Sequence, residues 1–175
     1  MTPRMVSENE AGSLSSVYAE IRSRLGLRRV PNVFKAMAAI SHDVLLQNWT
    51  AFSRTVLEGS LPRTIKEMVA LVVAREQGSG YGVCFYSQML YQLGVSGPVV
   101  RSLTEYGDCP EFPPDLRRLL AFARECSLDP EGMDADGLEM VGFSEDDALE
   151  VIDTVLIALG ISQFADECGL AADGD

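Results

Sequence analysis

Apolar residues recur at every third or fourth position along most of this 175-residue chain. That spacing places them on one side of an α-helix, whereas a half-buried strand would alternate apolar and polar residues. No alternating stretch of convincing length is present. The clearest helical stripes lie within residues 14–25, 45–56, 65–73, 116–126 and 149–159. The sequence therefore predicts an all-α helical bundle of about seven to nine helices, in a single domain that spans residues 1–175.

Glycine, proline and serine mark the ends of several predicted helices. Gly26 is expected to cap the first stripe, because glycine readily adopts the left-handed conformation found after helix C-termini. Pro62 suits the start of the next long helix, and Ser144 begins the spacing of a capping box. The glycine-rich residues 77–82 separate two helices, of which the second is predicted over residues 83–93. The last helix is predicted to bury Leu149, Ile152, Val155, Leu156 and Leu159.

The charge of the chain is unevenly distributed. In total, 14 Lys and Arg stand against 26 Asp and Glu, which gives a net charge of −12. Residues 1–100 hold ten basic and seven acidic residues, whereas residues 101–175 hold four basic and 19 acidic residues. Such a negative half repels nucleic acids and anionic membranes, so we expect neither as a partner. The acidic half is interpreted as a solvated surface, with an acidic docking surface as the alternative.

The N-terminal segment MTPRMVSENEAG differs from a secretory signal. It lacks an apolar core and includes Glu8 and Glu10. By sequence, no apolar run approaches the roughly 18–20 residues of a membrane helix. We therefore expect a cytoplasmic protein.

Cysteine and histidine content restricts the available metal chemistry. Cys84, Cys109, Cys126 and Cys168 lie too far apart in sequence to form a C-x-x-C pair for zinc or dithiol chemistry. His42 is the only histidine, which excludes a site built from several histidines. We therefore predict no metal and no cofactor.

Three segments carry a recognisable pattern. Residues 61–94 contain Glu67 on one predicted helix and Ser79-Gly-Tyr-Gly82 before the next. Residues 25–34 read Leu-Gly-x-x-x-Val-Pro-Asn-Val-Phe, and residues 164–169 read Phe-Ala-Asp-x-x-Gly. Together they resemble the carboxymuconolactone decarboxylase/alkylhydroperoxidase D (AhpD-like) superfamily, and in particular its peroxidase-related branch. The resemblance covers nearly the whole chain and implies the AhpD-like helical fold.

The resemblance also implies a redox motif that this chain lacks. The superfamily pattern is a glutamate on one helix and C-x-Y-C-x-x-x-H at the start of the next. Glu67 matches the glutamate and Tyr81 matches the tyrosine. Ser79 and Gly82 stand in the cysteine positions, and Tyr86 stands in the histidine position. Because the peroxidase reaction needs a thiolate and a second, resolving thiol, we expect no dithiol peroxidase activity.

Glu67 and Tyr86 each have two interpretations. Thr64 and Glu67 have the spacing of a capping box, although Pro62 would place the cap nearer Ser60. In the functional interpretation, Glu67 is a buried carboxyl whose raised pKa suits proton transfer. Tyr86 is either a packing residue or a general acid that works with Glu67.

The remaining candidates are Cys84, Tyr81, Ser79 and His42. Cys84 is predicted to be a small buried residue, and its alternative is a catalytic thiol near a helix N-terminus. Tyr81, Ser79 and His42 are candidates for substrate binding. The structural alternatives are a packing role for Tyr81, which would fix its loop, and a surface position for His42.

These candidates lead to one preferred function and two alternatives. The preferred function is a non-redox enzyme acting on a small molecule, with isomerase, lyase or decarboxylase chemistry through Glu67 and Tyr86. The first alternative is a non-catalytic ligand-binding or structural homologue, in which Tyr86 and Phe85 fill the site. The second is a residual antioxidant hydroperoxidase that uses Cys84. The resemblance and the wide apolar helix faces also imply a homo-oligomer, either a dimer, a trimer or a hexamer.

Overall fold

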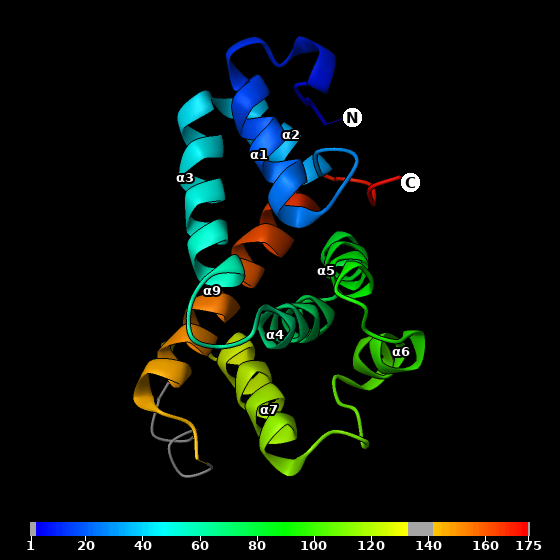
Figure 1. Cartoon of the computed structure of the whole chain (residues 1–175), viewed down its shortest axis with the longest axis vertical. Coiled ribbons are helices and arrows are strands. Elements are labelled where there is room, and N and C mark those ends of the chain that lie inside the picture. The colour runs from blue at the N-terminus through cyan, green and yellow to red at the C-terminus, as the bar shows by residue number, and fades with distance from the viewer. Residues whose placement is uncertain (1–2, 133–141, 175) are drawn as a thin grey trace.

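The computed structural model describes residues 3–132 and 142–174, and these residues form eight α-helices and no strands (Figure 1). The prediction of an all-α fold with about seven to nine helices is therefore confirmed. The helices are α1 (Ser15–Leu25), α2 (Asn32–Ile40), α3 (His42–Phe52), α4 (Arg63–Glu76), α5 (Gly80–Gln92), α6 (Gly97–Tyr106), α7 (Pro114–Leu128) and α9 (Glu145–Glu167). Short 3-10 turns are η1 (Glu8–Glu10), η2 (Gly12–Leu14) and η4 (Pro130–Gly132), and η3 (Ser53–Leu57) is a π-helical turn.

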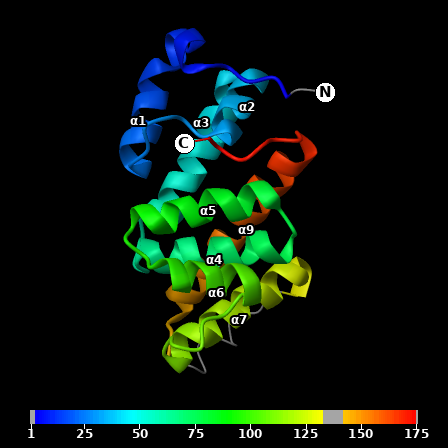
Figure 2. The same cartoon turned by 90° about the vertical axis from the view of Figure 1, so that its right-hand side faces the viewer.

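Helix α4 is the centre of the bundle. It packs against α5, α6, α7 and α9, and Figure 2 shows it between α5 and α7. Its residues 66–74 are all buried, which includes the charged Lys66 and Glu67. A helix that is covered on every side places even its polar residues in the core. Two charged side chains are thereby held where water does not reach them.

An aromatic cluster joins the α2–α3 pair to α5. Phe34 of α2 makes edge contacts with Trp49 and Phe52 of α3, with ring centroids 5.5 and 5.8 Å apart. Phe85 of α5 lies 6.5 Å from Phe34 and 6.1 Å from Phe52. Edge-to-face packing of this kind holds rings at defined angles. It fixes the face of α5 from which Tyr86 projects.

Several predicted helix ends are confirmed. Gly26 follows α1 in the left-handed conformation, with a φ of 71°. Ser144 forms a capping box at the start of α9. Helix α5 starts at Gly80, a few residues before the predicted position, because Ser79 accepts a hydrogen bond from Gly82 N and caps it. Local capping chemistry therefore extends α5 into the glycine-rich segment.

The prediction for the buried face of α9 is partly wrong. Leu149 and Leu156 are 49% and 47% exposed. Val155 is buried as predicted, and Ile152 and Leu159 are half-buried. The rest of the buried face is formed mainly by other residues, most of them small: Ala148, Val151, Ala158, Ile161 and Ala165. The small side chains let α9 lie close to α4, whereas the larger leucines point outward. By length and hydropathy α9 would be long enough to cross a membrane, but here it packs along α4, α5 and α7.

Candidate functional site

Glu67 is enclosed in the core at the second turn of α4. Its side chain is 0% exposed, and its Oε1 accepts a hydrogen bond from Arg63 Nε at 3.2 Å. Its Oε2 has no hydrogen-bond partner. Burial raises the pKa of Glu67 from 4.5 to about 7, against the opposing influence of Arg63 and Lys66. A carboxyl with this pKa exchanges its proton readily near neutral pH.

The capping-box interpretation of Glu67 is wrong. Helix α4 begins at Arg63, directly after Pro62, and no side chain caps it. Glu67 therefore lies inside the helix rather than at its first turn, and its carboxylate bonds Arg63 one turn earlier.

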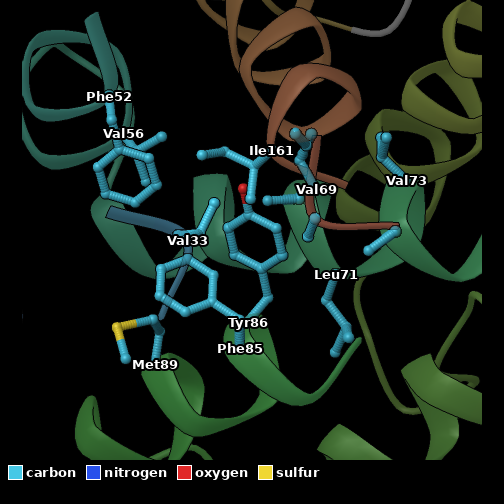
Figure 3. Packing of buried hydrophobic residues seen from close by; sticks show 14 of the residues in the cluster. Val33, Phe52, Val56, Val69, Leu71, Val73, Phe85, Tyr86, Met89 and Ile161 are labelled. Carbon is cyan, nitrogen blue, oxygen red and sulfur yellow. The ribbon is translucent and has the colours of Figure 1, made fainter. Parts of the chain in front are cut away.

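Tyr86 reaches the same part of the core from α5. Its side chain is fully buried, and its hydroxyl has no hydrogen-bond partner. Figure 3 shows the ring rising from α5, with the hydroxyl directed towards Val69 and Ile161. Burial, and then the charge of Glu67, raise the pKa of Tyr86 well above its usual range. The group therefore stays a neutral phenol that can donate a hydrogen bond.

Three helices contribute polar atoms that lack partners. In the described part of the chain, the buried side-chain oxygens without a hydrogen bond are Glu67 Oε2, Tyr86 Oη and Ser162 Oγ. They come from α4, α5 and α9, respectively. Buried polar atoms are nearly always paired in folded proteins, so unpaired ones point to a water, a ligand or a chemical role. The charge of Glu67 acts on the Tyr86 hydroxyl, so these two groups, which we call the buried cluster, form the candidate site, and Ser162 Oγ lies beside Gly82.

Gly82 sits where the superfamily pattern places a cysteine, and packing leaves no room for a side chain there. A Cβ at Gly82 would lie 2.7 Å from Ser162 Oγ, 2.8 Å from Ala74 Cβ and 3.2 Å from Ser79 Oγ. Helix α5 therefore approaches α4 and α9 too closely at this point to hold a thiol. The helix packing around Gly82 is therefore incompatible with a cysteine at this position.

We expect Gly82→Ala to lower the free energy of unfolding by about 1–3 kcal/mol, because the added methyl group overpacks the core. Gly80→Ala is the matched control, since Gly80 is on the same helix and a Cβ there meets nothing within 4 Å. Urea unfolding of both variants measures the difference. Equal stability of Gly82→Ala and Gly80→Ala would contradict this close approach of α5.

Stability should also depend on the protonation of Glu67. Between pH 4.5 and about 7 the folded chain keeps a proton on Glu67 that the unfolded chain has lost. The stability that this carboxyl contributes is complete below pH 4.5 and disappears as the pH rises through about 7, a change of roughly 3 kcal/mol. Urea unfolding at a series of pH values should show this fall in the wild type and not in Glu67→Gln. Parallel pH profiles of the two proteins would refute it.

The structure places Ser79 and Tyr81 in supporting roles. Ser79 is buried; its Oγ accepts from Gly82 N at 3.1 Å and donates to Asp166 Oδ1 at 3.0 Å. Tyr81 stacks on Phe85, and its hydroxyl accepts from Val33 N at 3.0 Å. The Tyr81 hydroxyl also donates to Asp173 Oδ2 at 2.8 Å. Both side chains hold the start of α5 in place.

Cys84 and His42 are not brought into the buried cluster. Cys84 is exposed on the outer side of α5, so the prediction that it is buried is wrong. Its neighbours Phe85 and Tyr86 take the inward positions. His42 is an exposed first residue of α3, beside the cap that Ser41 provides. Within the described residues, no group of three or more His, Cys, Asp or Glu side chains is arranged to hold a metal.

Sequence reasoning missed Arg63, which bonds Glu67, and Ser162, which lies beside Gly82. Arg63 lies one helical turn before Glu67, a spacing that predicts an ion pair. Ser162 is a lone serine on the apolar face of α9, and no local pattern relates it to Gly82. Only the crossing of α9 over α5 brings them together.

The helix arrangement defines the class of the protein: this chain has the AhpD-like all-α fold, as the sequence resemblance predicted. No protein-family model matches the chain. Among curated proteins, an alkyl hydroperoxide reductase of Mycobacterium tuberculosis is 35% identical over 83 residues. That alignment covers 47% of this chain and 23% of the mycobacterial protein, so this chain spans only a minor part of that relative's length.

Solved structures match over almost the whole chain. The debrominase Bmp8, as a cysteine-to-alanine variant in complex with 2,3,4-tribromopyrrole, superposes with a TM-score of 0.84. It is 19% identical, and the match covers 99% of this chain and 92% of that one. A peroxidase-related protein from Silicibacter sp. gives a TM-score of 0.82 at 20% identity, over 93% of this chain and 86% of that one. An AhpD-core peroxidase-related protein from Ralstonia eutropha gives 0.80 at 19% identity, with the same coverage.

Proposed function

We propose that this protein is a non-redox enzyme of the AhpD-like fold that moves protons on a small organic molecule. Glu67 acts as the general base and Tyr86 as the hydrogen-bond donor or general acid. The observation that carries the proposal is that Glu67 Oε2 and Tyr86 Oη are both buried without a hydrogen-bond partner and that the charge of Glu67 acts on the Tyr86 hydroxyl. The pKa of Glu67, about 7, suits a base that works near neutral pH.

The proposed reaction involves no change of oxidation state in the protein. A C–H bond beside a carbonyl breaks, its proton passes to Glu67, and its electron pair moves onto the carbonyl oxygen. The Tyr86 hydroxyl stabilises that oxygen by a hydrogen bond. Return of the proton to a different carbon gives an isomer, and loss of a neighbouring leaving group gives a lyase reaction.

The substrate class is a small aromatic or keto acid. Support for a molecule of this size comes from Bmp8, which shares the fold and was crystallised with a single halogenated pyrrole ring. A reaction that uses only a carboxyl and a phenol is also consistent with the absence of cysteine from positions 79 and 82.

A second candidate function is supported by a different observation. Three cavities in the described structure, of about 450, 320 and 460 Å³, are lined by neither Glu67 nor Tyr86. Phe85 and Tyr86 pack tightly, with ring centroids 5.0 Å apart. A non-catalytic ligand-binding or structural homologue would have a site that is filled in this way.

Deuterium exchange separates the two candidates. The protein is incubated in D2O with a panel of small aromatic and keto acids and 2,3,4-tribromopyrrole, and proton NMR follows the loss of carbon-bound hydrogen. An enzyme should accelerate exchange for at least one compound, and Tyr86→Phe should slow it. Tyr18→Phe is the control, because Tyr18 is also buried but its hydroxyl bonds Val6 O. If no compound shows either deuterium exchange or a thermal shift, the result favours the non-catalytic homologue.

Thiol chemistry is tested separately. The name of the mycobacterial relative makes hydroperoxide reduction the obvious rival. Cys84, the one cysteine near the motif, is exposed and free. A peroxide-consumption assay should give the same low rate for the wild type and Cys84→Ala, whereas loss of activity in Cys84→Ala would support the hydroperoxidase.

A further inference from the structure

A cavity of about 450 Å³ is lined by Asp173, which accepts a hydrogen bond from Tyr81, and by neither Glu67 nor Tyr86. It is walled by the α1–α2 loop, the start of α2, the outer face of α5 and the segment after α9. Its lining includes Arg28, Arg29, Lys35, Gln88, Gln92 and Asp173. A space of this size suits a small organic molecule.

The cavity is basic although the chain is acidic. Arg28, Arg29 and Lys35 line it, while the whole chain carries a net charge of −12. Among the described residues, these three cations form no ion pair. Basic groups gathered in a concave site attract anions and raise their local concentration.

One anion is already seated in the cavity, and it belongs to the chain itself. Asp173 Oδ1 accepts a hydrogen bond from Asn32 N at 2.6 Å, and its Oδ2 accepts from Tyr81 Oη at 2.8 Å. Asn32 is the first residue of α2, so the carboxylate occupies the positive end of that helix. These bonds recognise both oxygens of a carboxylate group.

Residues 170–174, which we call the strap, carry this carboxylate. The strap starts at the buried Leu170, whose N donates to Ala165 O at 2.9 Å. Besides the Asp173 hydrogen bonds, the strap accepts a 3.4 Å hydrogen bond at Ala171 O from Asn32 Nδ2. Burial raises the pKa of Asp173 in spite of its hydrogen bonds and the nearby Lys35. The Asp173 carboxylate therefore loses an appreciable part of its hydration in this position. This loss makes its replacement by the carboxylate of a ligand feasible.

We infer that this cavity is a binding site for a small organic acid with two or more carboxylates, and that Asp173 occupies one carboxylate position until the ligand displaces the strap. One ligand carboxylate replaces that of Asp173 and accepts hydrogen bonds from Asn32 N and Tyr81 Oη. A second faces Arg28, Arg29 and Lys35. The inference is independent of the proposed function, because it rests on residues outside the buried cluster and is tested by binding alone.

Calorimetric titration with malonate, succinate, glutarate and citrate tests the site. At least one of these acids should bind the wild type, and the neutral succinamide should not. Asp173→Asn removes the competing charge but keeps an oxygen for Asn32 N, and it should tighten binding about tenfold. Lys35→Gln should weaken binding about fivefold. Asp153→Asn, an exposed change on α9, is the control and should leave the affinity unchanged.

The second measurement follows the strap in the wild-type protein. The heteronuclear NOE values of the Ala171 and Gly174 amides should fall when the acid saturates the site, because the strap is released. Binding by none of the four acids overturns the inference. So does equal affinity of the wild type, Asp173→Asn and Lys35→Gln, or a strap that stays rigid when the acid is bound. Arg28→Gln, an exposed change in the loop, replaces Lys35→Gln if that variant fails to fold.

Discussion

Glu67→Gln is expected to lower the rate of deuterium exchange into a substrate by about 10²- to 10⁴-fold, the usual contribution of a positioned general base. Glutamine has nearly the same shape and can still accept a hydrogen bond from Arg63, so the helix packing should survive. It cannot accept the proton, because its amide is not basic. Exchange is measured by proton NMR on any compound that the wild type turns over.

The control for this substitution is Glu20→Gln. Glu20 is an exposed glutamate that accepts a hydrogen bond from Trp49 Nε1 at 3.0 Å, far from the cluster in the sequence. Glu20→Gln should leave the rate of deuterium exchange unchanged. If Glu67→Gln keeps full activity and every ligand affinity of the wild type, Glu67 has no role in the site.

Glu150→Ala is expected to lower the free energy of unfolding by about 3–5 kcal/mol, the usual effect of removing one partner from a buried ion pair. Lys66 is 1% exposed, and its Nζ lies 3.4 Å from Glu150 Oε2 and also bonds Glu58 O. Without Glu150, the ammonium group stays buried with a single carbonyl partner. The Glu150 carboxylate also accepts hydrogen bonds from Ser60 N at 2.5 Å and Leu61 N at 3.1 Å.

Urea unfolding measures this loss, with Asp153→Ala as the control. Asp153 lies on the same helix and is exposed, so its replacement should change stability little. Adding Lys66→Met to Glu150→Ala should restore part of the lost stability, because the unpaired charge is then removed. A loss below about 1 kcal/mol in Glu150→Ala would mean that the pair is effectively solvated.

The elements that depend on neighbouring residues were predicted well from the sequence. Gly26 and Ser144 end or begin helices by local chemistry, so their roles are visible in a few consecutive residues. The burial of α9 was harder to predict because apolar residues occur on several of its faces. The pattern favoured the large Leu149 and Leu156, whereas close helix packing selected small residues such as Ala158.

Only part of the candidate site and its surroundings could be predicted from the sequence. The resemblance singled out Glu67 and Tyr86, and the structure buries both with unpartnered oxygens. It could not reveal that Ser162 and Ala74 close the space above Gly82, because that contact joins three helices. Asp173 was equally hidden, since its partners Asn32 and Tyr81 are remote in sequence.

The pH dependence of deuterium exchange by the wild type tests most directly whether Glu67 is the base. A base must be ionised to accept a proton, so the rate should rise with pH and reach half of its maximum near the Glu67 pKa of about 7. The rate should then level off, and Glu67→Gln should show neither the rise nor the activity. A rate without an inflection between about pH 5.5 and 8.5, or the same inflection in Glu67→Gln, would contradict the assignment.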